Sequence, residues 1–533
     1  MKKHYCLGFI LLSIVIHPAP AWSHEDAIPG GRLGKVSFAN SCSKKVKPQF
    51  EVGVAMLHSF WFSAAEKTFD DVLAKDPKCA IAAWGLASIL MNNPLAGTGA
   101  SSAGAKKAVA ALENARSVGA GTRRERDYID AVSFYYEDWD NRGERARQTA
   151  RADAFEQLAA RYPKDDEAQI FYALYRAGTQ SQADQTYSAY LKAAAILEAQ
   201  FKKYPGHPGV AHYLIHSYDA PPIAKKGMEA ARRYAKIAPD APHALHMPSH
   251  IFTRVGAWED SASANRRSMD VARKGGEADE AYHAVDYMVY AFLQLGRDEE
   301  ARRVTQEVMQ VNGMNPGRFV APYAVAAMPA RLMVERGMWK EAAQLPVTPT
   351  TYPFVAAITH FARAIGAARS GDAAAAAMDA EQLAVLHKSL ETAKNTYWGT
   401  EVEIQRLAVA GWIALAEGKS DEALKLMRAS ANLEDKNEKH IVTPGRILPA
   451  RELLGDMLLE LKQPRLALAE YQASQAREPN RFRNLYGSAV AAQAAGDNVI
   501  ADKYFRQLVA LAAKGDGTRP ELALAKKAVI ASK

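Results

Sequence analysis

The stretch LLGDMLLELKQPRLALAEYQASQAREP, residues 453–479, decides the fold. It has a small residue near its start, a second small residue 12 positions later, an aromatic residue at 16 positions and a proline at 24 positions: Gly455, Ala467, Tyr471 and Pro479. Two small residues let two antiparallel helices cross closely, the aromatic side chain fills the gap to the next pair, and proline ends the second helix. The stretch therefore predicts a helical hairpin that stacks on neighbours of the same kind.

The same spacing recurs along the chain, first at 34 residues further on, and again near the N-terminus and in the middle. The matching residues are Ala489, Ala501, Phe505 and Leu508; Gly53, Ala65, Phe69, Val72 and Pro77; Ala230, Tyr234, Ile237 and Pro242; and Gly411, Ala423 and Met427. This pattern resembles the tetratricopeptide repeat (TPR) superfamily. The resemblance implies an all-α, right-handed superhelical solenoid of TPR-like antiparallel helix pairs, and no stretch shows the alternation of a strand.

Several segments are also similar to a narrower group of uncharacterised secreted bacterial TPR proteins. These segments include LHSFWFSAAEKTFDDVLAKDPKCAIAAWGLA, HPGVAHYLIHSYD, HALHMPSHIFTRVGAW, YHAVDYMVYAFLQLGR and VTPGRILPARELLGDMLLE. The resemblance covers most of the chain. It implies the fold and export, and it implies no settled activity.

The start of the chain predicts export. Lys2 and Lys3 precede the apolar run LGFILLSIVI and the small residues of HPAPAWS, an order typical of a secretory signal peptide. No later stretch has the roughly 20 apolar residues of a transmembrane helix, so we expect a periplasmic or secreted protein. Proline- and glycine-rich interruptions divide the chain into a signal peptide (1–23), an N-terminal extension (24–45), an N-terminal TPR array (46–345), a C-terminal TPR array (346–512) and a C-terminal tail (513–533).

Two cysteines remain beyond the predicted leader, because Cys6 lies inside it. Cys42 precedes the first helix of the first repeat, and Cys79 opens the first helix of the second. In an oxidising compartment such a pair favours a disulfide, and two buried thiols are the alternative. First helices of neighbouring repeats lie side by side, so the positions favour the bridge, which would stabilise the first hairpin by about 3–4 kcal/mol.

Histidines gather in one part of the chain, where seven of the 14 fall between residues 207 and 283. Two pairs spaced four apart and one histidine–aspartate pair spaced three apart are the candidate metal ligands: His212 and His216, His246 and His250, and His283 and Asp286. Residues four apart share one helix face, so each pair can close on one ion. His250 also falls where the repeat normally has glycine or alanine, a departure of the kind that marks functional sites. Pro248 lies inside the second pair, and a kink there would separate the two rings.

The ligand types indicate which metal to expect. Imidazole and carboxylate suit zinc or copper, and Asp219 and His243 lie near enough in sequence to complete the shell. Each of these residues has a plain alternative as a packed or surface side chain. No HExxH, GxSxG, P-loop or dinucleotide motif is present, so the sequence names no catalytic residue and favours a non-enzymatic role. The net charge of +8 is scattered among acidic residues, which argues against a nucleic-acid partner.

Two functions of different classes follow from these observations. The first is an exported scaffold whose concave groove binds a protein or peptide, as the resemblance implies, with His58, Trp61, Arg254 and Trp258 as predicted contacts. The second is a transition-metal-binding protein or metalloenzyme that uses the cluster between residues 207 and 286. The sequence favours the first. Metal content separates the two, because only the second should lose bound metal when the histidines are replaced.

Overall fold

The computed structural model of the chain describes residues 1, 31–315 and 317–531. This part of the chain is built from α-helices, with one short 3₁₀ helix and no strand, so the predicted all-α helical-repeat fold is confirmed. The predicted signal peptide lies outside the described residues, apart from Met1. Within the described part, no helix combines the length and the apolar character that crossing a membrane requires.

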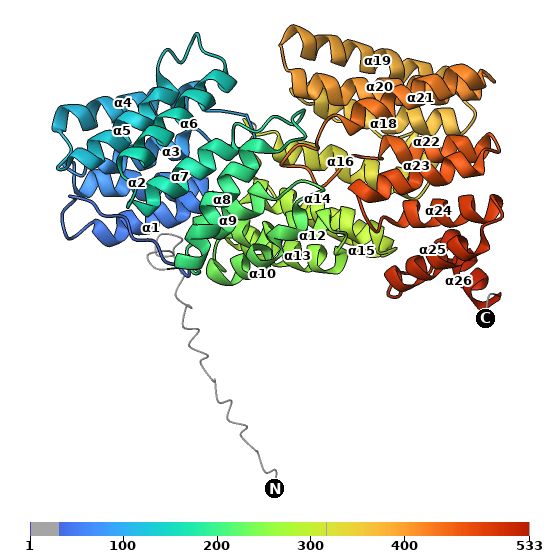
Figure 1. Cartoon of the computed structure of the whole chain (residues 1–533), viewed down its shortest axis with the longest axis horizontal. Coiled ribbons are helices and arrows are strands. Elements are labelled where there is room, and N and C mark those ends of the chain that lie inside the picture. The colour runs from blue at the N-terminus through green and yellow to red at the C-terminus, as the bar shows by residue number, and fades with distance from the viewer. Residues whose placement is uncertain (2–30, 316, 532–533) are drawn as a thin grey trace.

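Consecutive helices stack as antiparallel hairpins from one end of the molecule to the other (Figure 1). The first helices, in chain order, are α1 (Lys47–His58), α2 (Phe62–Lys75), α3 (Ile81–Leu90), α4 (Ser102–Val118), α5 (Arg123–Tyr136), α6 (Glu144–Arg161), α7 (Asp166–Ala177), α8 (Ser188–Lys203), α9 (Pro208–Ser217), η1 (Ala224–Gly227), α10 (Met228–Ile237), α11 (Pro242–His246), α12 (Pro248–Arg254), α13 (Trp258–Lys274), α14 (Ala278–Gln294) and α15 (Asp298–Val308).

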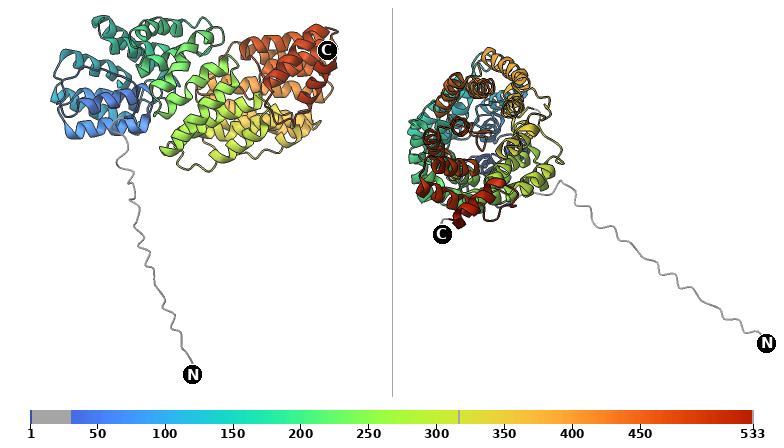
Figure 2. Two further views of the ribbon diagram at one scale, coloured as in Figure 1. Left: turned by 90° about the horizontal axis from the view of Figure 1, so that it is seen from below. Right: turned by 90° about the vertical axis from the view of Figure 1, so that its right-hand side faces the viewer.

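The stack continues without a break into the second half of the chain, because α16 packs directly against α18 across the predicted array boundary at residues 345 and 346. Seen end-on, the helices follow a ring-like path around the long axis of the molecule (Figure 2). The remaining helices are α16 (Val320–Glu335), α17 (Trp339–Ala342), α18 (Pro353–Arg369), α19 (Ala373–Thr392), α20 (Thr396–Ala416), α21 (Ser420–Asp435), α22 (Ala450–Glu460), α23 (Pro464–Arg477), α24 (Phe482–Ala494), α25 (Asn498–Leu511) and α26 (Pro520–Ala531).

In two hairpins, the aromatic residue of the repeat lies between two glycines, one on its own first helix and one on the next. A methyl group added at Gly455 would lie 2.8 Å from the ring of Tyr471, and one added at Gly487 would lie 2.4 Å from it. Phe69 has the same relation to Gly85, at 2.4 Å. The other residues chosen for packing are buried: Gly53, Ala65, Ala230, Tyr234, Pro242, Ala467, Ala501 and Phe505. At these two places the hairpins therefore stack through an aromatic ring that only glycine leaves room for.

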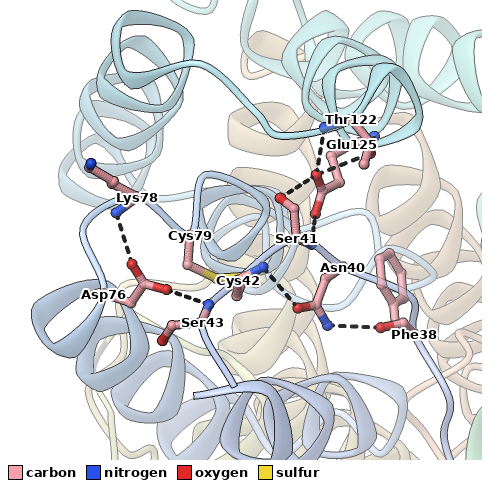
Figure 3. Close-up of a disulfide and its surroundings, with 10 residues drawn as sticks. All are labelled: Phe38, Asn40, Ser41, Cys42, Ser43, Asp76, Lys78, Cys79, Thr122 and Glu125. Carbon is pink, nitrogen blue, oxygen red and sulfur yellow. Dashed lines mark hydrogen bonds between the residues drawn. A yellow bond between two sulfur atoms is a disulfide. The ribbon is translucent and has the colours of Figure 1, made fainter. Parts of the chain in front are cut away.

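Cys42 and Cys79 lie at disulfide distance, with their Cα atoms 4.5 Å apart (Figure 3). Cys42 precedes α1, and Cys79 precedes α3 shortly after the exposed Pro77. Asp76 supports this joint, because its carboxylate accepts from the backbone N–H of Ser43 at 2.7 Å. The predicted pairing is confirmed, and it ties the entry of the chain to the second hairpin.

The segment between α21 and α22, residues 436–449, is an inserted loop that enters the interior of the first array. Arg331 on α16 donates to the carbonyl of Gly445 at 2.7 Å. The ammonium group of Lys439 lies 3.3 Å from the carboxylate of Asp219, which follows α9. At this place the interior face of the solenoid is covered by the chain itself.

Candidate metal centre

The predicted histidines lie on helices that pack against each other inside the first array. His212 and His216 belong to α9, His246 ends α11, His250 lies on α12 and His283 on α14. All five are buried, the most exposed being His283 at 6%. Pro248 does divide the helix, but Met247 keeps a helical backbone (φ −52°, ψ −36°) across the break. The rings of His246 and His250 therefore stay one turn apart on the same face.

The Nε2 atoms of His246 and His250 face each other at 3.0 Å. The Nδ1 atom of His246 lies 2.6 Å from Oδ1 of Asn265, whose amide nitrogen donates to the carbonyl of Ser261 at 2.8 Å. That second bond fixes the orientation of the amide, so Nδ1 of His246 carries the proton. Nδ1 of His250 donates to the Asp219 carboxylate at 2.8 Å. When both rings are neutral, neither Nε2 atom carries a proton.

Two lone pairs at this distance repel each other unless a cation or a shared proton lies between them. A shared proton requires a charged imidazolium, and burial lowers the pKa of His250 to about 4, which opposes that form at neutral pH. Burial alone would raise the pKa of Asp219, but Lys439 and Arg254 outweigh it and hold that pKa well below its ordinary value. Asp219 thus stays ionised and keeps Nδ1 of His250 protonated, the tautomer that leaves Nε2 free to bind a metal.

A second set of donor atoms lies on the neighbouring helices. Nδ1 of His212 donates to the carbonyl of His58 at 2.7 Å, and its Nε2 lies 3.1 Å from Nε2 of His216. Nδ1 of His216 is buried and has no hydrogen-bond partner among the described residues. His243 resembles His250 in that its Nδ1 lies 3.1 Å from a carboxylate, that of Glu280. Its Nε2 is buried and has no partner in the part of the chain that the structure describes. This set also presents ring nitrogens whose bonding capacity the protein does not satisfy.

The donor atoms form two sets of three, with the atoms of each set within 4.8 Å of one another: His212, His216 and His243 in the first set, and His246, His250 and His283 in the second. The two sets are neighbours, because the ring centroid of His216 lies 5.5 Å from that of His250. Burial lowers the pKa of His283 to about 3 and holds the pKa values of His212 and His216 well below the ordinary value. These three imidazoles are therefore neutral, the form that binds metal ions.

A third group, His58, Glu167 and His207, has similar distances but a different explanation. The Glu167 carboxylate accepts from Nε2 of both histidines at 3.0 Å. Nδ1 of His58 lies 3.0 Å from the Tyr213 hydroxyl, and Nδ1 of His207 accepts from the backbone N–H of Val210 at 3.3 Å. Every ring nitrogen has a partner, so hydrogen bonds alone account for this group.

Other predicted residues lie elsewhere. Asp286 contacts Arg331 at 3.3 Å instead of joining the histidine sets, and burial raises its pKa to about 6. The predicted partner contacts His58, Trp61, Arg254 and Trp258 are at most 8% exposed. The structure buries all four side chains, and each of them contacts another part of the chain.

Those interior contacts are specific. The Trp61 indole donates to Glu277 at 2.8 Å, the Trp258 indole donates to the carbonyl of Asn480 at 2.7 Å, and Arg254 donates to Asp219 at 2.8 Å. Asn265, Glu280 and Lys439 are the residues of the centre that the sequence did not suggest. Glu280, three positions before His283, was within reach of a pattern argument; Asn265 and Lys439 had no sequence signal.

Comparisons with known proteins leave the chain outside any matched family. No family model matches its sequence, and no curated protein matches it. Solved structures to which it is similar include the human IFIT1 dimer with m7Gppp-AAAA, at 12% identity and a TM-score of 0.37, covering 77% of this chain and 87% of that one. Another is the APC/C hetero-tetramer Cut9–Hcn1, at 12% identity and a TM-score of 0.27, covering 91% of this chain and 96% of that one.

Proposed function

We propose that this TPR-like scaffold is a transition-metal protein that holds two ions in the two sets of three histidines. The observation that carries the proposal is the pair of Nε2 atoms, on His246 and His250, that face each other 3.0 Å apart without protons. Two nitrogens bound to one zinc ion at 2.0–2.1 Å in tetrahedral geometry lie about 3.3 Å apart. The spacing therefore suits a shared ion, and the all-imidazole donor sets suit zinc or copper.

The scaffold fold by itself suggests protein binding. The interior face near the histidines is covered by residues 436–449, and the predicted contact residues are buried. These observations favour the histidine sets over a peptide-binding groove as the functional site of the protein. We also propose that the protein is exported, on the leader-like start of the sequence and on the pair Cys42–Cys79, which suits an oxidising compartment.

The test is a count of bound metal. The full chain, purified without a histidine tag, is dialysed against zinc and separately against copper, and retained metal is measured by mass spectrometry. We expect two ions per chain. The double variants His212→Ala/His216→Ala and His246→Ala/His250→Ala should each retain one.

The double variant His58→Ala/His207→Ala is the matched control, since it removes two buried histidines from the group that hydrogen bonds explain, and it should retain two ions. Circular dichroism on each sample reports folding. Absence of retained metal in the unaltered chain would refute the proposal. So would equal metal loss in all three folded variants, because that result would show no preference for the two proposed sets.

A further inference from the structure

A chamber of about 500 Å³ lies beside the histidine sets. Its wall includes His243 from the first set and His283 from the second, together with Glu280 between them on α14. Nε2 of His243 is buried and has no hydrogen-bond partner among the described residues. A molecule in this chamber therefore meets both sets at once.

Another part of the chamber wall is aromatic and comes from the second half of the chain. The rings of Phe354 and Trp398 stack with centroids 4.0 Å apart and an angle of 5° between their planes. His440, on the inserted loop, lies 4.9 Å from Trp398 at 25°, and the edge of Phe319 approaches His440 at 5.4 Å. Flat, packed rings of this kind accept another planar ring at low entropic cost, because they are already held in place.

The charge around the chamber favours an anion. The six histidine side chains bring no negative charge to the two sets, so two divalent ions would add a formal charge of about +4. The nearby carboxylates of Asp219 and Glu280 offset only part of this charge, because Asp219 is itself paired with Arg254 and Lys439. An anion from outside would therefore balance charge that the protein leaves uncompensated.

Two arginines in the chamber wall add to this preference. Arg318 is half-buried; its guanidinium lies 4.5 Å from the Phe62 ring centroid, and it donates to Asn92 at 3.2 Å. Neither Arg318 nor the exposed Arg145 forms an ion pair with a carboxylate of the described residues. Asp279 is the remaining carboxyl in the wall; burial raises its pKa to about 6, so it is mostly ionised at neutral pH, and the nearby charge of Arg318 acts against it.

We propose that this chamber binds a small planar aromatic carboxylate, with its carboxylate toward the metal ions and Arg318 and its ring against the wall of Phe354 and Trp398. The proposal rests on the proposed metal centre for part of the charge that attracts the ligand. The aromatic wall and Arg318 are independent of it. A site of this kind makes the protein a binder of a metal-associated organic acid, beyond holding the ions themselves.

Benzoate is the probe, titrated by calorimetry into the metal-loaded full chain. Cyclohexanecarboxylate keeps the charge and loses the planar ring, and benzamide keeps the ring and loses the charge. We expect each to bind at least about 10-fold more weakly than benzoate, since each loses one of the two recognised features. Arg318→Gln and Trp398→Leu should each lower the affinity for benzoate by a similar factor. Arg303 is an exposed arginine on α15, so Arg303→Gln should leave that affinity unchanged.

Metal is counted in every sample so that the two proposals fail separately. A chain that retains two ions and does not bind benzoate overturns the chamber proposal alone. Binding of benzamide or cyclohexanecarboxylate as tight as that of benzoate overturns the assigned ligand class. An equal loss of benzoate affinity in Arg303→Gln and Arg318→Gln overturns the assignment of the ligand to this chamber. A chain that retains no metal refutes the metal centre, and benzoate affinity that still depends on Arg318 and Trp398 would then support the chamber on its own.

Discussion

The Nε2 atoms of His246 and His250 lie 3.0 Å apart on two rings whose Nδ1 atoms both already donate to oxygen acceptors. Neither acceptor binds metal in the proposed arrangement; each one fixes which nitrogen of its histidine carries the proton. Asn265 does this for His246, and Asp219 for His250. The relation makes the tautomer of each ring, and not only its position, a condition for metal binding.

Asn265→Ala should lower metal affinity without touching a ligand. It removes the acceptor of Nδ1 of His246, so the ring is free to place its proton on Nε2. We expect the affinity for one of the two ions to fall by about 10- to 100-fold. A competition titration with a zinc chelator measures this. Asn484→Ala is the matched control, because Asn484 is also fully buried and donates to a backbone carbonyl, that of Tyr471, at 2.8 Å. Equal losses in both variants would contradict the role given to Asn265.

Glu167→Gln tests the group that hydrogen bonds explain. Burial would raise the pKa of Glu167, but His207 and His58 outweigh it and hold that pKa well below its ordinary value. The unfolded carboxyl has a pKa of about 4.3, so Glu167 contributes stability above that pH, and the contribution is lost as the pH falls below it. We expect the variant to unfold about 2 kcal/mol more easily at neutral pH.

The difference in unfolding free energy should narrow as the pH falls from about 5 to about 3. Urea unfolding at a series of pH values measures it, and metal content should stay at two ions per chain. A difference that does not change with pH would mean that the Glu167 carboxylate is not the source of the stability.

Gly487→Ala tests the stacking of hairpins. The added methyl group would lie 2.4 Å from the Tyr471 ring, which cannot move aside because Gly455 lies behind it and its hydroxyl donates to Asp456 at 2.6 Å. Overpacking of this kind costs about 1–3 kcal/mol. Denaturant unfolding measures it. Gly206→Ala, where no atom lies within 4 Å of the added methyl group, should change stability little.

Cys79→Ser should loosen the first hairpin. The bridge to Cys42 closes a sequence separation of 37, so its loss should cost about 3–4 kcal/mol on the loop-closure model. Hydrogen exchange of α1 measures the loss locally. The unaltered chain treated with dithiothreitol should behave like the variant, and the variant itself should not respond to dithiothreitol. If neither the substitution nor dithiothreitol changes hydrogen exchange in α1, the disulfide does not stabilise the N-terminal hairpin.

The fold and the histidine pairs were predictable because their signals are local. The spacing of Gly455, Ala467 and Tyr471 lies within one hairpin, and a four-residue spacing puts His212 and His216 on one face of one helix. The two sets of three were not predictable, since they depend on how α9, α11, α12 and α14 stack. No spacing rule relates His216 to His250 across that interface.

The burial of the predicted partner contacts was not predictable for a related reason. Trp258 was predicted to contact a partner in the groove, but its indole donates to the carbonyl of Asn480, a residue 222 positions away. A sequence pattern within one repeat carries no information about a contact between residues more than 200 positions apart. Lys439 was missed in the same way, because only the path of the inserted loop brings it to Asp219.

The inserted loop also sets an order of events in the life of the chain. In most repeat proteins each hairpin contacts mainly its neighbours, so the N-terminal part can complete itself while the rest is still being made. In this chain, the contact of Asp219 with Lys439 can form only after a further 220 residues have been made. All six histidines have therefore been synthesised long before residues 436–449, which cover them, are made. If the proposed centre holds metal, an ion that reaches the incomplete chain would meet these histidines before Lys439 and the rest of the loop cover them.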